Sequence, residues 1–136
     1  MKKKYLIVVA DYYRDIADGL ISSALKIIPK KSIIKIIKVP GAFEIPVTIS
    51  KNLKKYDGFL ALGCVIKGQT YHFEVISDSV GLALLELVNN NSKTLITNGI
   101  INANNKNQAL KRSQLNEKNK GYEAASALVR MIQCLI

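Results

Sequence analysis

The sequence predicts an α/β protein, a three-layer αβα sandwich in which helices cover both faces of a four-stranded parallel sheet. Two observations predict this class. Short continuous apolar runs, typical of strands buried on both faces, alternate with longer segments whose apolar residues recur at helical spacing. The chain has 136 residues, 49% of them hydrophobic, which suffices for one core of ordinary size. We therefore expect a single domain over residues 1–136.

The first half of the chain is expected to form two strands and two helices. The apolar run in KYLIVVA (4–10) predicts a first strand and is shorter than the roughly 7–15 residues of a signal-peptide core. Apolar residues at helical spacing predict a helix over 14–28, which Pro29 ends. The β-branched segment 32–39 predicts a second strand, and a Pro–Gly turn then leads to a helix over 47–56.

The second half continues the alternation. The run GFLALGCVI (58–66) predicts a third buried strand, and the apolar residues after it keep helical spacing over 70–90. KTLITNGII (93–101) predicts a fourth strand. Two closing helices are expected over 105–112 and 121–136.

This order of elements also predicts where a ligand binds. Parallel strands that alternate with helices are joined by right-handed crossovers, and four such strands make a flavodoxin-like sandwich. Ligands bind such folds at the carboxyl ends of the strands. Those ends are predicted near 11–12, 40–44, 67–72 and 98–101.

The chain has a formal net charge of +10. Its lysines are scattered, asparagine is also abundant, and the sequence has no helix-turn-helix, zinc-ligand or aromatic ribonucleoprotein motif. We therefore expect no nucleic-acid partner, although a positive surface favours small anionic substrates. No membrane span is predicted. Cys64 and Cys134 show neither metal-ligand nor redox spacing, which favours a reducing cytoplasm and no metal.

The single histidine follows a glycine turn between the third predicted strand and the long helix. Gly68 lets the chain turn closely, and the free N–H groups of the helix start, with Gln69 and Thr70, suit a phosphate. His72, in the first helical turn, suits proton exchange with a substrate amine or hydroxyl. The alternatives are that Thr70 only caps the helix and that His72 is packed or solvated without a role.

Three further segments carry candidate residues. In VPGAFEIP, Phe43 and Glu44 suit a pocket wall and hydroxyl binding, or else a core position and a helix start. Tyr12 either stacks on a planar ligand or covers the edge of the sheet. Arg112 and Lys120 lie eight residues apart. The guanidinium of Arg112 suits forked recognition of a phosphate, and the ammonium of Lys120 suits a phosphate as a point charge. The alternative is that both are solvated cations of the surface.

Taken together, the segments IVVADYYRDI, VPGAFEIP, LGCVIKGQTYHFEV, NGI and NKGYEAA resemble the lumazine synthase family. They occur in the family's order between residues 7 and 125. Members of that family condense 5-amino-6-(D-ribitylamino)uracil with 3,4-dihydroxy-2-butanone 4-phosphate, releasing phosphate and water, in the penultimate step of riboflavin biosynthesis. The resemblance implies a transferase that needs neither metal nor cofactor.

The resemblance also implies a role for each matching residue. His72 would transfer protons, and Gln69, Thr70 and Arg112 would bind the phosphate of the butanone. Lys120 would lie over the forming ring, on the ribitylaminouracil side. The remaining residues that would bind the ribitylaminouracil are Tyr12, Ala42, Phe43, Glu44, Cys64, Val65, Ile66 and Asn98. Among these, Tyr12 would stack on the pyrimidine, Glu44 would bind ribityl hydroxyls, and 64–66 would act mainly through the backbone.

Three residues depart from the family's usual pattern. Asn98 stands where many members have a large aromatic residue, so contacts with the ring are expected to differ there. Tyr12 replaces the more frequent Phe, which keeps the stacking face and adds a hydroxyl. Gln69 is bulkier than the small residue often found, which leaves the role of its side chain open.

The family forms pentamers whose active sites lie between neighbouring subunits, and some members assemble twelve pentamers into an icosahedral shell. The resemblance implies at least a pentamer and leaves the shell open. Two other functions compete: a non-catalytic relative that binds flavin or lumazine, and a basic nucleic-acid-binding protein. The presence of Glu44, His72, Arg112 and Lys120 together argues against lost activity, because a binding protein has less need of the phosphate ligands.

Overall fold

The computed structural model, which describes residues 2–135, contains a four-stranded parallel sheet with the strand order β2-β1-β3-β4. The strands are β1 (Lys4–Ala10), β2 (Ile33–Val39), β3 (Gly58–Ile66) and β4 (Ile96–Ala103). The helices are α1 (Arg14–Ile27), the short 3-10 turn η1 (Ala42–Glu44), α2 (Ile45–Ser50), α3 (His72–Asn89), α4 (Lys106–Lys111) and α5 (Lys120–Leu135).

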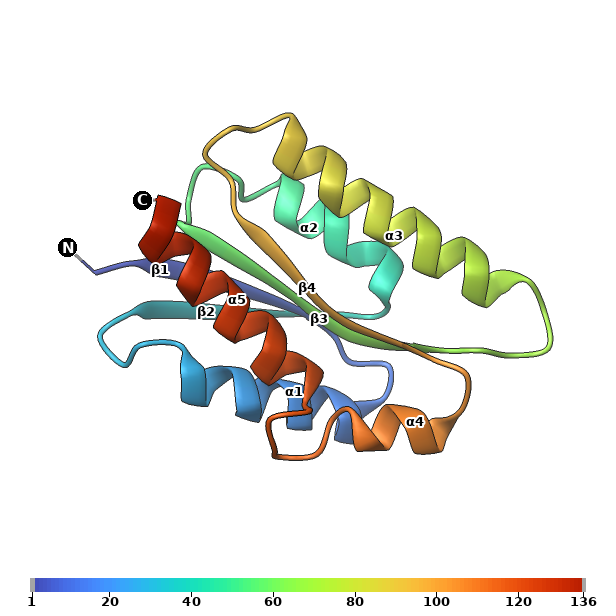
Figure 1. Cartoon of the computed structure of the whole chain (residues 1–136). Helices are drawn as coiled ribbons and strands as arrows, with labels where there is room; N and C mark the ends of the chain where they lie inside the picture. Colours follow the sequence, from blue (N-terminus) through green and yellow to red (C-terminus); the bar gives the residue numbers. More distant parts are fainter. Residues whose placement is uncertain (1, 136) are drawn as a thin grey trace.

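Helices cover both faces of the sheet, so the predicted three-layer α/β class is confirmed. Helices α1 and α5 pack side by side on one face, and α2 and α3 cover the other (Figure 1). The two faces bury separate apolar cores, because successive side chains of a strand point to opposite sides. In β1, for example, Ile7 and Val9 lie in the α1/α5 core, whereas Leu6 and Val8 lie in the α2/α3 core.

Two predicted elements have different bounds in the structure. The helix predicted over 47–56 begins earlier, at η1 and α2, because Pro46 fits the first turn of a helix, where its missing N–H leaves no partner unpaired. Residues 51–55 then form turns. Strand β4 covers 96–103 instead of 93–101, since the Thr94 N–H is used in a turn to the Asn91 carbonyl at 2.9 Å.

The shifted bounds of β4 correct the predicted place of Asn98. This residue was expected at a carboxyl end of the sheet, but it is the third residue of the eight-residue strand β4. The carboxyl end of β4 is Ala103. The other three predicted strand ends agree with the structure, and the apolar helix predicted over 121–136 corresponds to α5, with Ile136 outside the described residues.

A close backbone contact fixes the loop between α4 and α5 against α1. A Cβ atom on Gly121 would overlap the Leu20 carbonyl, and one on Gly19 would overlap the Ser113 carbonyl. Both positions therefore require glycine, which is the residue that permits such close approach. The loop that carries Arg112 and Lys120 is consequently held on the surface of α1.

Candidate functional site

The segments that follow β1, β2 and β3 meet at the carboxyl edge of the sheet and line a cavity of about 630 Å³, here called the aromatic cavity. The loop after β1 contributes Tyr12, and the turn η1 contributes Ala42, Phe43 and Glu44. The end of β3 contributes Cys64, Val65 and Ile66, and the first residue of α3, His72, completes the predicted set. Residues far apart in the sequence therefore lie together, as the positions of the strand ends predicted.

Two aromatic rings of this cavity are open to solvent. Tyr12 is 76% exposed and Phe43 is 60% exposed, although both line the cavity. The edge-to-face contact of Tyr12 with Tyr13, at 4.9 Å between ring centroids, holds the exposed ring. The Lys106 ammonium lies over the ring of Tyr13, 5.0 Å from the ring centroid. The cavity thus presents exposed aromatic rings on which a planar ligand can stack.

The backbone at the end of β3 is free on one side. Pairing of β3 with β1 stops at Leu62, whereas its pairing with β4 continues to Ile66. The backbone N–H and C=O groups of 64–66 that point toward β1 therefore have no strand partner. Because such groups need hydrogen bonds, this segment is suited to a ligand with donor and acceptor edges.

Cys64 lines the aromatic cavity as a neutral thiol. Burial raises its pKa from 9.0 to about 11, with Lys106 opposing the shift and Asp15 adding to it. Since the thiolate is the nucleophilic form, Cys64 is not an activated nucleophile at neutral pH. Its contribution is shape and an apolar surface.

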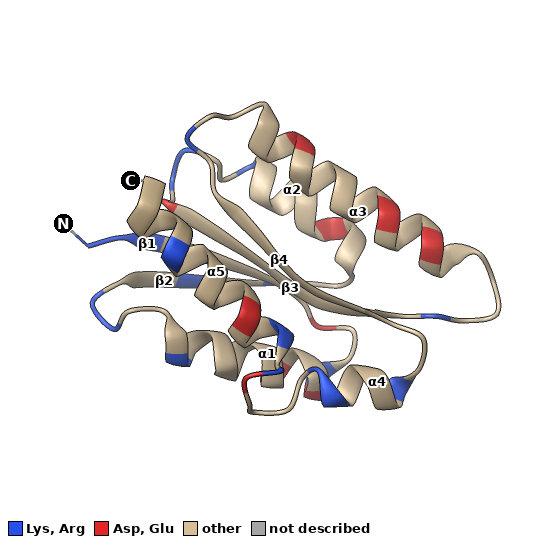
Figure 2. Cartoon of the chain, in the orientation of Figure 1, with Lys and Arg blue, Asp and Glu red and all other residues tan. Residues whose placement is uncertain are grey.

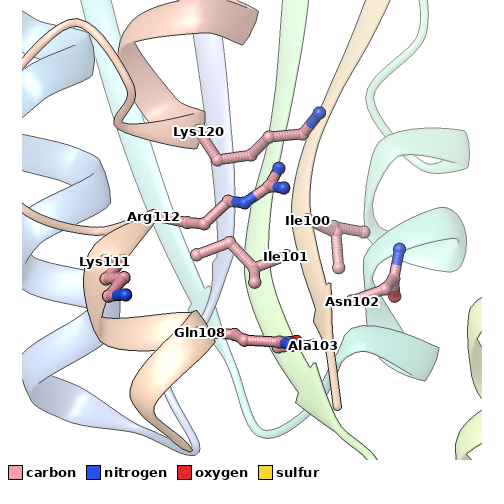
Figure 3. A pocket seen from close by; sticks show the side chains of 8 residues that line it. All are labelled: Ile100, Ile101, Asn102, Ala103, Gln108, Lys111, Arg112 and Lys120. Carbon is pink, nitrogen blue, oxygen red and sulfur yellow. The ribbon is translucent and has the colours of Figure 1, made fainter. Parts of the chain in front are cut away.

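Arg112 and Lys120 line a second cavity of about 460 Å³, here called the basic cavity, between α4, the start of α5 and the edge strand β4. Their side chains extend in the same direction, toward β4 (Figure 3). Lys111 also lines this cavity, and none of the described residues that line it has a carboxylate. Lys120 forms an ion pair with Glu123 at 3.3 Å beside the cavity. The cavity is suited to a doubly charged anion such as phosphate.

Asn119 holds the two cations in place and is a residue that motif reasoning missed. Its side chain is fully buried and makes four hydrogen bonds. The amide donates to the carbonyls of Gly19 at 3.1 Å and Gln114 at 2.9 Å, while its oxygen accepts from the N–H groups of Gly121 and Tyr122. The Lys120 N–H donates to the Arg112 carbonyl at 2.7 Å. An asparagine directly before a helical apolar pattern is the N-cap signal that identifies such a residue.

One chain does not bring all the predicted residues together. The aromatic and basic cavities share no lining residue. Among the described residues, Gln69 and Thr70 line neither cavity and are exposed, and the Thr70 hydroxyl accepts a long hydrogen bond of 3.4 Å from the His72 N–H. Asn98 lines a small crevice beside α3, where its side-chain oxygen accepts from the Ile100 N–H at 2.9 Å.

Within 2–135, no group of three or more His, Cys, Asp or Glu side chains is placed to hold a metal ion. Among the same residues, no helix has the length and apolar character needed to cross a membrane.

Comparison with known proteins identifies the family. The family model for 6,7-dimethyl-8-ribityllumazine synthase matches residues 2–135. The chain is 44% identical to a 6,7-dimethyl-8-ribityllumazine synthase of Bartonella bacilliformis, with 93% of this chain and 86% of the relative covered. It is 39% identical to the protein of the same name from Agrobacterium fabrum, over 98% of this chain and 95% of the relative. The chain therefore belongs to the 6,7-dimethyl-8-ribityllumazine synthase family.

Proposed function

We propose that this chain condenses 5-amino-6-(D-ribitylamino)uracil with 3,4-dihydroxy-2-butanone 4-phosphate to give 6,7-dimethyl-8-ribityllumazine, phosphate and water. The observation that carries the proposal is the convergence of eight matching residues on the aromatic cavity at the carboxyl edge of the sheet. Residues 1–136 act as one domain in this proposal. The two free cysteines suit a reducing compartment, so the proposal places the enzyme in the cytoplasm.

The aromatic cavity binds the ribitylaminouracil. The exposed ring of Tyr12 stacks on the pyrimidine, and the free backbone of 64–66 pairs with its polar edge. Ala42 and Phe43 form the wall beside it, and Glu44 accepts hydrogen bonds from ribityl hydroxyls. A planar, polar-edged molecule with a hydroxylated chain matches this lining better than a purely apolar ligand does.

The phosphate of the butanone is bound by Arg112 together with Gln69 and Thr70 at the start of α3. The free N–H groups of that helix end and the guanidinium favour an anion. Lys120 lies over the forming ring, and Asn98 contacts it from the edge of the sheet. His72 accepts and returns protons as the amine attacks the ketone, the imine forms and phosphate leaves.

The active site lies between two copies of the chain. One copy supplies the aromatic cavity, which includes His72, together with Gln69 and Thr70. Its neighbour supplies Asn98 from the edge strand β4, Arg112 from the end of α4 and Lys120 from the start of α5. The support is that one chain holds Arg112 and Lys120 in a cavity that shares no lining residue with the cavity of Tyr12 and His72. A contact between different surfaces builds a ring when its rotation closes. We propose that it closes here as a pentamer or as an icosahedral assembly of pentamers.

Positioning supplies much of the catalysis, because both substrates are already reactive and need no strong acid. His72 is therefore helpful and not indispensable. We expect His72→Ala to lower kcat by no more than about 10⁴-fold, the upper range for general acid–base catalysis. A larger loss in a steady-state assay would show that His72 does more than move protons.

The test of the function is to mix purified protein with both substrates and follow lumazine formation by absorbance or fluorescence. We expect turnover well above the uncatalysed condensation, and a decrease of about 10–100-fold in kcat/KM for the butanone phosphate in Arg112→Ala. Lys118→Ala is the matched control, because Lys118 is an exposed cation of the same loop outside the basic cavity. Tight lumazine binding by a folded assembly without turnover would contradict the proposal and favour the non-catalytic relative.

A further inference from the structure

A third cavity lies at the amino end of the sheet, the end opposite the loops that form the aromatic cavity. It has a volume of about 550 Å³ and is here called the lysine basin. Lys2 and Lys4 border it from the start of β1, and Lys54 and Lys55 from the turn before β3. Ile33, Tyr56 and Asp57 complete its lining. The volume is in the range of small-molecule sites, about 300–1,000 Å³.

Positive charge predominates in the lining of the lysine basin. Of the ten acidic residues in the chain, Asp57 is the one that lines it, and its carboxylate accepts a hydrogen bond from the Lys4 N–H at 2.8 Å. Among the described residues, none of the four lysines forms an ion pair. Figure 2 shows Lys and Arg at the start of β1 and in the loops that lead into β2 and β3. Four exposed lysines thus line one hollow, with a single, already bonded carboxylate among them.

The basin also has an apolar wall. Tyr56 is half-buried, and its ring packs edge-to-face on Phe59 at 5.9 Å, which fixes its position. Ile33, on the edge strand β2, leaves about half of its side chain exposed at 47%. A ligand that suits this lining has several negative charges close together and a flat apolar part beside them.

We propose that the lysine basin binds a small anion with linked phosphates, of the nucleoside triphosphate class. Lysine binds phosphate as a point charge, and several lysines around one hollow suit a chain of phosphates better than an isolated carboxylate. The apolar wall of Ile33 and Tyr56 takes the nucleoside part. The proposal is independent of the condensation reaction, because none of these residues lines the aromatic or basic cavity.

The chain provides a matched pair of variants for the test. Lys54 and Lys55 are adjacent lysines in a turn of the basin, and Lys30 and Lys31 are adjacent lysines in the turn between α1 and β2, outside it. Lys54→Glu/Lys55→Glu and Lys30→Glu/Lys31→Glu change the net charge equally. Far-UV circular dichroism and the thermal midpoint establish that each variant is folded.

The experiment measures binding of adenosine triphosphate and inorganic tripolyphosphate to the assembled protein by titration calorimetry. We expect saturable binding with a Kd below about 1 mM, a loss of about tenfold or more in Lys54→Glu/Lys55→Glu, and a change below about twofold in Lys30→Glu/Lys31→Glu. Tighter binding of adenosine triphosphate than of tripolyphosphate would show that the apolar wall takes part.

Three results would overturn the proposal. Equal losses in the two double variants would mean that diffuse surface charge attracts the anion. Loss in Arg112→Ala, with no change in Lys54→Glu/Lys55→Glu, would place the anion in the basic cavity. Binding of a single-stranded oligonucleotide without binding of either small anion would mean that the surface is a nucleic-acid interface.

Discussion

Asn119 touches neither the aromatic nor the basic cavity, yet four backbone groups depend on its side chain. It joins α1 to the start of α5 through the Gly19 carbonyl, a contact between residues 100 positions apart. Arg112 is exposed and Lys120 is half-buried, and a hydrogen bond from the Lys120 N–H to the Arg112 carbonyl joins their backbones. Their spacing therefore depends on a buried amide that carries no charge.

We predict that Asn119→Ala lowers stability by about 2–3 kcal/mol, because buried groups lose their partners and α5 loses its N-cap. It also raises KM for the butanone phosphate more than KM for the ribitylaminouracil. Thermal unfolding and steady-state kinetics with each substrate varied check this. Asn116→Ala is the control, since Asn116 is exposed and its side chain accepts one bond, from the Lys118 N–H. Equal changes in the two KM values would mean that Asn119 is merely structural.

Cys64 and Cys134 are predicted to react differently with a thiol reagent. In Cys134→Ser, with the exposed thiol removed, we expect no fast reaction at pH 8, because burial raises the pKa of Cys64 to about 11. In Cys64→Ser, the remaining Cys134 reacts at once. Fast labelling of the native Cys134→Ser protein would contradict the burial of Cys64.

The raised pKa of Cys64 makes the stability of the fold depend on pH. The pKa of Cys64 is higher in the folded chain than its ordinary value of 9.0, so folding disfavours the thiolate. The stability associated with the neutral thiol is complete below pH 9 and is lost as pH rises toward about 11. Denaturant unfolding at several pH values, compared with Cys64→Ser, measures this loss.

At the scale of elements, helix α3 has apolar residues on two faces, one packed on the sheet and one exposed. Val80 and Leu84 are buried on the sheet, whereas Val75, Leu82 and Leu85 are exposed and lie in one stripe at helical spacing. A long helix with apolar residues on its outer face is typical of a surface covered by another chain. This stripe supports the proposed assembly.

We predict that Leu82→Asp dissociates the assembly into smaller species, because a charge replaces an apolar side chain worth about 1.5–3 kcal/mol when buried. Sedimentation velocity measures the change. Leu25→Asp is the control, since Leu25 on α1 is also exposed and lies outside the stripe. An unchanged sedimentation profile for Leu82→Asp would exclude the stripe from the interface.

At the scale of the whole molecule, the separation of the two cavities leads to a complementation experiment. Tyr12→Ala damages the aromatic cavity, and Arg112→Ala damages the basic cavity. When the two variants are unfolded, mixed in equal amounts and assembled together, about a quarter of the sites combine two intact halves. We therefore expect about a quarter of the wild-type activity, well above either variant alone. Activity equal to the mean of the two variants would place the whole site in one chain.

The predictable part of the fold follows from local patterns. The run at 58–66 is apolar throughout because β3 lies in the middle of the sheet between α-helical layers, and its bounds agree with the structure. Strand β4 differs, since the Thr94 N–H bonds the Asn91 carbonyl in a turn that the apolar pattern over 93–101 does not show. The predicted bounds of β4 were therefore displaced, and with them the place of Asn98.

The sequence by itself determined the α/β class, the order of the elements and the family, because apolar periodicity and short motifs are local properties of the chain. It also identified the residues that line the aromatic cavity, since the carboxyl ends of parallel strands meet at one edge. Only the tertiary structure decided that Arg112 and Lys120 occupy a different cavity, that Asn119 positions them, and that four lysines from two distant segments border one basin. These are contacts between segments far apart in the sequence, and they exist only when the packing of helices on the sheet brings the segments together.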